Sequence, residues 1–183
     1  MKKITLIFII AILCFSCGEE TLPKPKSYLK LQYPSAKYQK ISSNCPYTFE
    51  ASTYANVAIK NNCWAKIEYP NLKATIHITY REVDGNLNAI LKEVEKLTFE
   101  HTIKADVISD IPYDDVDKKV YAKLYNIEGN VATNVQFRAT DSLNHVLSGA
   151  LYFYAKPNYD SIVPAIKYIE KDMVKLVETL AWK

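Results

Sequence analysis

One ten-residue stretch near the end of the chain restricts the fold more than any other. Residues 145–154, HVLSGALYFY, alternate like a β-strand, and both sets of side chains are largely apolar. One set comprises Leu147, Leu151 and Phe153, and the other comprises Val146, Ala150, Tyr152 and Tyr154. A strand that is apolar on both faces needs cover on both faces. The sequence therefore predicts a strand inside a layered domain.

Two amphipathic segments can supply that cover. Residues 87–102 predict a helix, with Asn86 as its cap and an apolar stripe formed by Leu87, Ile90, Leu91, Val94 and Leu97. A longer helix begins at Asp160 or Ser161 and tolerates Pro164 in its first turn. Its apolar stripe comprises Ile162, Ile166, Ile169, Met173, Leu176, Val177 and Leu180. Its solvated side comprises Lys167, Glu170, Lys171, Asp172 and Lys175. We expect one helix on each face of the sheet.

Short alternating segments separated by turn residues predict the rest of the sheet. These segments are residues 47–50, 63–69, 72–81, 105–112, 119–127 and 131–140, and Pro112 is expected to end the fourth of them. Runs of strands joined by short turns favour antiparallel pairing. We therefore expect residues 47–183 to form a single α+β domain, with a largely antiparallel sheet flanked by two amphipathic helices. The arrangement is similar to the layered PsbP/Mog1-type sandwich, which is an analogy of fold alone.

The N-terminus reads as an export signal. Lys2 and Lys3 precede an apolar run, Ile4–Phe15, which is shorter than the roughly 20 residues that a helix needs to cross a bilayer. Ser16 and Cys17 follow, as at a bacterial lipoprotein cleavage site. We predict a signal peptide at residues 1–16 and acylation of Cys17, which anchors the protein to a membrane. The alternative is an ordinary signal cleaved near Ser16, with Cys17 as a plain thiol.

Residues 17–46 predict a lipidated tether rich in proline and lysine. Prolines at positions 23, 25, 34 and 46 favour an extended chain, and lysines lie between them. These lysines are consistent with a solvated spacer and also with a membrane-surface patch. Within the tether, residues 28–33 alternate weakly and could form an edge strand that Pro34 ends.

Cysteine usage indicates an oxidising compartment. Of the four cysteines, Cys14 lies in the signal and Cys17 takes the lipid. The remaining pair, Cys45 and Cys63, is expected to form a disulfide, because an even number of cysteines in an exported chain usually pairs. The functional alternative is a reactive thiol at Cys45.

Composition and motifs argue against several functions. The formal net charge is only +3, which gives no basic surface for nucleic acid. The four glycines are too scattered to form a phosphate-binding loop, and the common hydrolase and zinc-peptidase motifs do not occur. We therefore expect no catalytic residues, no cofactor and no enzyme activity.

The histidines and one acidic turn are the remaining candidates for a site. His77 and Arg81 share one face of a predicted strand and could form a ligand face, although a half-exposed polar sheet face explains them equally well. His101 and His145 lack partners at metal-ligand spacing. The turn with Asp114, Asp115 and Asp117 lacks the length and the distal glutamate of a calcium loop. The sequence therefore predicts no metal site.

Several stretches resemble the gliding motility lipoprotein GldD family of Bacteroidetes. They are Leu22–Pro34 with its Pro-Lys pattern, Thr79-Tyr80, the long motif from Asp141 through Tyr152-Phe153 to Asn158, and the ending Trp182-Lys183. The resemblance implies an envelope lipoprotein, facing the periplasm or the cell surface, that gliding requires in bacteria with type IX secretion. We expect a non-catalytic accessory protein that contacts protein partners of this machinery. The alternative is a lipoprotein that binds a small ligand or a glycan between sheet and helix.

Overall fold

The computed structural model describes residues 33–100, 104–154 and 158–183. Cys17, the signal peptide, residues 28–32 of the tether and His101 lie outside these ranges. The described residues form ten strands and two α-helices, so the α+β prediction is confirmed. Seven strands form one antiparallel sheet in the order β3-β4-β5-β9-β8-β7-β6. Their bounds are β3 Asn56–Ile59, β4 Ala65–Tyr69, β5 Ala74–Glu82, β6 Val107–Asp115, β7 Val120–Glu128, β8 Thr133–Thr140 and β9 His145–Phe153.

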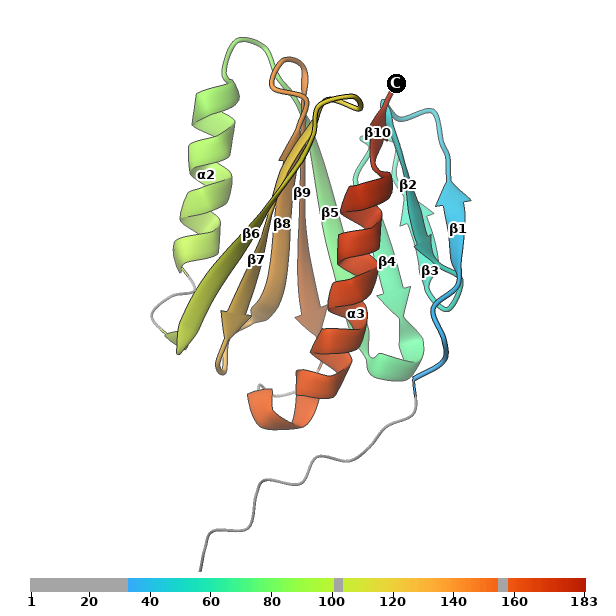
Figure 1. Ribbon diagram of the computed structural model, residues 1–183, viewed down its shortest axis with the longest axis vertical. Helices are drawn as coiled ribbons and strands as arrows, with labels where there is room; N and C mark the ends of the chain where they lie inside the picture. The colour runs from blue at the N-terminus through green and yellow to red at the C-terminus, as the bar shows by residue number, and fades with distance from the viewer. Residues whose placement is uncertain (1–32, 101–103, 155–157) are drawn as a thin grey trace, which may run out of the picture.

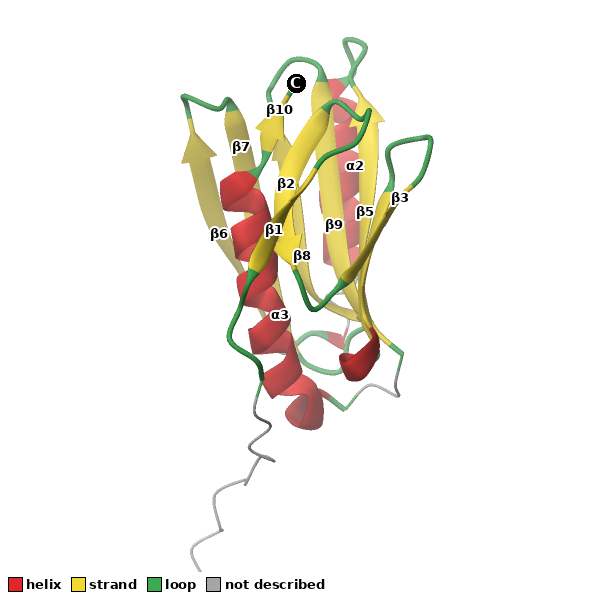
Figure 2. Ribbon diagram, turned by 90° about the vertical axis from the view of Figure 1, so that its right-hand side faces the viewer, coloured by secondary structure: helices red, strands yellow, loops and turns green. Residues whose placement is uncertain are grey.

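A second, smaller sheet and the two helices complete the layers. The small sheet has the order β1-β2-β10, with β1 at Tyr38–Ile41, β2 at Tyr47–Ser52 and β10 at Ala181–Trp182. Helix α3, Tyr159–Thr179, lies with this sheet on one face of the seven-stranded sheet. Helix α2, Leu87–Glu100, lies on the opposite face, and Figure 2 shows it behind the strands. The predicted arrangement, one helix on each face, is therefore confirmed.

Strand β9 lies near the middle of the sheet, as its two apolar faces require. Leu147 and Leu151 point into the main core under α3 and are fully buried. Ala150 and Ser148 point toward α2. Gly149 has no side chain because the ring of Phe137 occupies the space, so a Cβ built at Gly149 would lie 2.2 Å from Phe137 Cε1. Strand β9 is therefore covered on both faces: the core under α3 covers Leu147 and Leu151, and α2 lies over the face of Ser148 and Ala150.

Helix α3 buries its predicted stripe but begins differently from the prediction. Its buried residues are Ala165, Ile166, Ile169, Asp172, Met173, Leu176 and Val177. The N-cap is Asn158, whose carbonyl accepts the N–H groups of Ser161 and Ile162, and neither Asp160 nor Ser161 is the cap. Pro164 lies inside the helix, and Figure 1 shows the first turn bent away from the rest. A proline removes one helical hydrogen bond, which accounts for the bend.

Asp172 contradicts its predicted place on the solvated side of α3. Only 3% of it is exposed, because it lies on the core side of the helix. A lone buried carboxylate would be costly, but two tyrosine hydroxyls hydrogen-bond to it. The sequence pattern assigned it to solvent because aspartate is seldom buried without partners.

Two further differences concern strand limits. Strand β1 pairs with β2 inside the range 17–46 that the sequence assigned to the tether, so ordered structure begins before Tyr47. Strand β6 continues through Pro112, because an edge strand tolerates a residue without an N–H.

Helix α2 buries only Ile90 and Thr98, while Leu97 of the predicted stripe is 52% exposed. Asn86 holds the N-cap position as predicted, because its carbonyl accepts the N–H groups of Ala89 and Ile90. Its side chain accepts the N–H of Asp84 and makes no bond to the helix.

A disulfide joins Cys45 to Cys63, as predicted. The two Cα atoms lie 5.5 Å apart, and the bridge closes a loop between residues separated by 18 positions. Cys45 is buried and belongs to the main core. The hydroxyl of Tyr47 donates to the carbonyl oxygen of Cys63 at 2.6 Å. The bridge therefore holds the start of β2 close to the residues that lead into β4.

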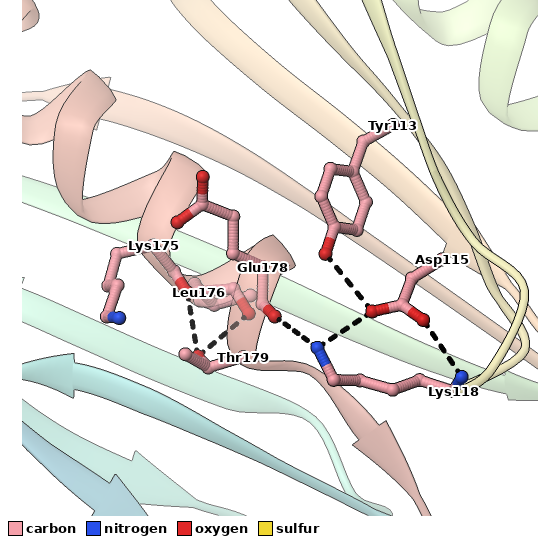
Figure 3. Close-up of polar contacts among 7 residues, drawn as sticks. All are labelled: Tyr113, Asp115, Lys118, Lys175, Leu176, Glu178 and Thr179. Atoms are coloured by element: carbon pink, nitrogen blue, oxygen red, sulfur yellow. Dashed lines mark hydrogen bonds and ion pairs between the residues drawn. The ribbon is translucent and has the colours of Figure 1, made fainter.

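We call the end of the molecule that carries β10 and the turns after β6 and β8 the distal end. At this end, Lys118 in the turn after β6 forms a hydrogen bond to the last turn of α3, as Figure 3 shows. Lys118 Nζ donates to the Glu178 carbonyl at 3.0 Å and pairs with Asp115 Oδ2 at 2.8 Å. A cation at a helix C-terminus is favourable because it meets the negative end of the helix dipole. Glu50 N donates to Thr179 Oγ1 at 2.9 Å, which also ties β2 to this helix end.

Candidate functional site: a cleft between α2 and the sheet

An open cleft lies where α2 only partly covers the sheet. Its volume is about 230 Å³. Strands β5 and β9 form its floor, and Val94 and Leu97 of α2 form one wall. Ser148, Gly149 and Ala150 on this floor have small side chains or none, so they leave the space above the strands unfilled. The cleft exists because α2 buries only two residues and leaves part of β5 and β9 on this face uncovered.

The cleft brings together both residues of the predicted ligand face. His77 and Arg81, with Thr79 between them on β5, all line it. Alternation along β5 points these side chains to the face opposite the core residues Ile76 and Ile78. Their shared location is observed, and a role in ligand binding remains a proposal.

Arg81 is already engaged by α2. Its guanidinium donates to both carboxylate oxygens of Glu93, at 2.6 and 2.8 Å. This bidentate pair lowers the pKa of Glu93 through the hydrogen bond and the charge of Arg81. Arg81 thus links the helix to the sheet, so an anionic ligand would have to displace Glu93 to reach its guanidinium.

His77 has the character of a neutral ring. Its imidazole packs edge-on against Tyr152, with 5.5 Å between the ring centres. Partial burial lowers the pKa of His77, and the nearby Lys66 lowers it further. Lys66 is directly opposite His77 on β4 and pairs with Glu68. The imidazole is therefore a neutral hydrogen-bonding group at neutral pH.

Gln136 also lines the cleft and was not among the predicted site residues. It is 8% exposed, and its amide contacts the hydroxyl of Thr98 at 2.9 Å between Gln136 Oε1 and Thr98 Oγ1. The other amide atom, Nε2, has no hydrogen-bond partner among the described residues. The Thr98 hydroxyl also lies 3.1 Å from the Val94 carbonyl oxygen, to which it can donate within the helix. This contact fastens the lower part of α2 to β8.

A second ion pair holds α2 beside the cleft. Arg138 of β8 donates to Glu95 at 3.0 Å and to the hydroxyl of Tyr125 at 3.2 Å. Arg138 and Arg81 each bind one glutamate of the helix, and Glu93 and Glu95 are two residues apart. The helix is therefore tied to the sheet by two ion pairs and has only two buried residues, in contrast to α3, which is held by its buried apolar stripe.

The other predicted candidates lie away from the cleft. His145 stacks on Trp182, and its Nδ1 is 2.8 Å from the hydroxyl of Tyr80 at the distal end. Asp115 accepts the Lys118 N–H at 3.0 Å, so it stabilises the turn after β6. Within the described ranges, no group of three or more His, Cys, Asp or Glu side chains is placed to hold a metal ion.

Sequence reasoning found two of the cleft residues and missed the others. Alternation along β5 identified His77 and Arg81, because residues two or four apart share a face. Gln136 of β8 and Glu93 of α2, which binds Arg81, were missed, because no spacing in the sequence brings them to His77 and Arg81. The one available signal was the polar pair Gln136 and Arg138, two residues apart on β8, which contact Thr98 and Glu95 of α2.

These features define a disulfide-bonded α+β domain with a shallow, open cleft lined by neutral or already paired groups. The family model of the gliding motility lipoprotein GldD matches residues 18–182, so the chain belongs to that family. No curated protein matches the chain. Membership associates the protein with gliding motility and with membrane anchoring in the cell envelope. None of the helices in the described ranges has the length and apolar character to cross a membrane.

Proposed function

We propose that this protein is a lipid-anchored, non-catalytic accessory protein of the gliding motility and type IX secretion apparatus. It acts by contacting protein partners, and the lipid on Cys17 keeps it at the membrane. Its family supports the association with motility. The contact role rests on the distribution of exposed apolar side chains.

The distal surface is the observation that carries the proposal. We define it as Trp64, Val116 and Leu143, which are 45%, 72% and 65% exposed. They project from the residues before β4, the turn after β6 and the turn after β8. Large apolar side chains on turn tips have no role in the core, and exposed groups of them are typical of protein interaction sites.

The cleft supports the non-catalytic part of the proposal. Its cation, Arg81, is bound by Glu93, and its histidine packs against Tyr152 and has no hydrogen bond to a carboxylate within the described ranges. Activated nucleophiles and general bases need a partner within hydrogen-bonding reach. The polar residues of the cleft serve instead to hold α2 on the sheet.

The test compares two surfaces in the native bacterium. Val116→Asp combined with Leu143→Asp places two charges on the distal surface, and we expect spreading over surfaces to stop. Leu97→Asp is the control, since Leu97 is a leucine that is also exposed, at 52%, but lies in the cleft. Protein level and membrane fraction are measured for each variant. Normal motility of the double variant at normal protein level would contradict the proposal.

A photo-activated cross-linker at position 143 extends the test. It should trap a protein of the motility apparatus, while the same cross-linker at position 92, on the exposed side of α2, should not. Trapping from position 92 alone would place the contact on α2 and would contradict a distal contact.

One observation favours a second function, the binding of a small neutral ligand in the cleft. Tyr152 is 36% exposed and stands beside the neutral His77 over a floor of small residues. Such a wall suits the apolar face of a sugar ring. Ala150→Trp would fill the cleft. Loss of motility in this variant at normal protein level, with the distal double variant unaffected, would favour ligand binding over protein contact.

A further inference from the structure

The end of the molecule opposite the distal surface carries a group of tyrosines and lysines. We define the proximal patch as Tyr33, Tyr54, Leu72, Lys73 and Tyr154. Tyr54 and Tyr154 are 45% and 60% exposed. The short 3-10 helix Pro70–Leu72 runs through the patch and links β4 to β5. Figure 1 shows this link and the start of α3 at the end opposite β10.

The patch is continuous. Tyr33, Tyr54 and Leu72 line one hollow of about 70 Å³, and Lys73 and Tyr154 line a neighbouring hollow of about 290 Å³. Both hollows share Tyr69. The N–H of Tyr154 donates to the carbonyl of Lys73 at 2.8 Å, so these two residues stay together. The surface is therefore aromatic and hollowed, with an exposed lysine at its edge.

The described chain begins inside this patch. Tyr33 is the first described residue, and its ring stacks on Tyr168 of α3 with 4.7 Å between ring centres. The chain from Cys17 to Tyr33 can span at most about 55 Å when fully extended. Since a nine-residue strand is about 30 Å long, the lipid lies closer to the proximal patch than to the distal surface for most tether conformations.

The chemistry of the patch fits a lipid surface. Tyrosine is enriched at membrane–water interfaces because its ring enters the headgroup layer while its hydroxyl stays hydrated. Lysines attract anionic headgroups. Lys73 and Lys37 are exposed, and the Lys37 carbonyl accepts the N–H of Thr53, the residue before Tyr54. The carboxylate of Glu68, which lines the same hollow as Lys73, is paired with Lys66. The patch therefore combines aromatic rings with the exposed Lys73, and Lys37 is a second exposed cation outside it.

We propose that the proximal patch docks on the membrane that holds the lipid anchor, with Tyr54 and Tyr154 in the headgroup layer. This inference rests on acylation of Cys17, which belongs to the proposed function, and adds an orientation to it. Docking points the distal surface away from the bilayer. The protein is then held upright on the membrane and does not swing freely on its tether.

The two native tryptophans provide an internal reference for a test. Trp64 contacts the Tyr80 carbonyl, and Trp182 stacks on His145, which is bonded to Tyr80, so both lie at the distal end. The acylated mature protein is reconstituted in vesicles of phosphatidylethanolamine and phosphatidylglycerol with brominated acyl chains. Bromine quenches tryptophan only at short range. We expect no quenching of the wild-type protein.

Tyr154→Trp adds a third tryptophan to the two in the chain, inside the patch. We expect brominated lipid to lower its total emission by about a third, because one emitter of three reaches the interface. Leu143→Trp, at the distal surface, is the matched control and should lose nothing. Lys73→Glu in the Tyr154→Trp background should reduce the quenching, whereas Lys92→Glu should not.

Each outcome decides the inference. Failure of the mature protein to float with vesicles removes the anchor and overturns both this inference and the lipid-anchored part of the proposed function. Flotation without quenching of Tyr154→Trp overturns docking alone, whether the patch is free, covered by the tether or covered by another protein. Equal quenching of Tyr154→Trp and Leu143→Trp also overturns it, because the domain then has no preferred orientation.

Discussion

The hydroxyl of Tyr69 donates a hydrogen bond to Asp172 Oδ2 at 2.9 Å, across 103 positions of the chain. Tyr38 donates to the other carboxylate oxygen, Oδ1, also at 2.9 Å. The carboxylate of α3 thereby joins the end of β4 to the start of β1. Burial raises the pKa of Asp172, although the two tyrosine donors oppose this rise. Burial and the adjacent Asp172 likewise raise the pKa of Tyr69.

Substitutions at Asp172 should separate hydrogen bonding from charge. Asp172→Ala leaves both tyrosine hydroxyls without their acceptor, and we expect it to cost about 1–3 kcal/mol of unfolding free energy. Asp172→Asn keeps an acceptor and buries no charge, so we expect a change within about 1 kcal/mol at neutral pH. Urea unfolding of both variants measures this. Equal losses would mean that the negative charge itself matters.

The raised pKa of Asp172 also predicts a pH dependence with a definite sign. A carboxyl group whose folded pKa exceeds its unfolded value of about 4 stabilises the fold in its protonated form. That contribution is complete below the unfolded pKa and is lost as pH rises through the folded pKa. Unfolding free energies measured across this window should therefore fall for the wild type relative to Asp172→Asn. A parallel course for the two proteins would contradict the raised pKa.

The layers of the fold could be predicted because they follow from local periodicity. Both apolar faces of β9 and the stripe of α3 repeat within a few residues, and the main core follows from them. Asp172 could not be predicted in this way. Its acceptor role depends on tyrosines 134 and 103 positions away, and the sequence spacing around it matches a solvated helix side.

The candidate site was predictable only along one strand. His77 and Arg81 are four residues apart on β5, and alternation places them on one face. What they do there depends on α2, because Glu93 binds Arg81 and Leu97 forms the wall of the cleft. Ion pairs with β5 and β8 help to position α2. The spacing of apolar residues in the sequence does not predict such pairs.

Gly149→Ala should lower the free energy of unfolding, although alanine is normally tolerated in a strand. The added Cβ would lie 2.2 Å from Phe137 Cε1, and Phe137 is fully buried, so the ring has little room to move. Overpacking of this kind typically costs about 1–3 kcal/mol. The double variant Gly149→Ala with Phe137→Leu should recover part of this loss in thermal unfolding. Equal stability of Gly149→Ala and wild type would show that the ring relocates.

The disulfide should stabilise the fold and leave no free thiol in the domain. Labelling of the exported protein without reductant should modify neither Cys45 nor Cys63. The double variant Cys45→Ala with Cys63→Ala should lose about 3 kcal/mol of unfolding free energy, because the open chain gains conformational freedom. Denaturant unfolding with and without reductant provides the comparison. Reductant should weaken the wild type and leave the double variant unchanged.

Glu93→Gln should loosen α2 without affecting α3. The substitution removes the charge that pairs with Arg81, and α2 has only two buried residues to hold it. We expect faster amide hydrogen exchange throughout α2 and unchanged exchange in α3, whose stripe is buried in the core. Glu100→Gln, at the end of the same helix, is the control. Identical exchange in both variants would show that the Arg81–Glu93 pair does not hold α2 on the sheet.

Cys17→Ser should release the protein from membranes and stop gliding. Several acyl chains anchor a protein firmly, whereas one chain binds only marginally, so the wild type should stay with membranes through a high-salt wash. Cys14→Ser alters a cysteine within the predicted signal peptide and should change neither membrane retention nor motility. The described contacts begin at Tyr33, so neither substitution removes any of them. Recovery of wild type and Cys17→Ser in the same soluble fraction would refute acylation. A soluble Cys17→Ser protein that still supports gliding would show that the lipid is dispensable and that partner contacts alone place the domain.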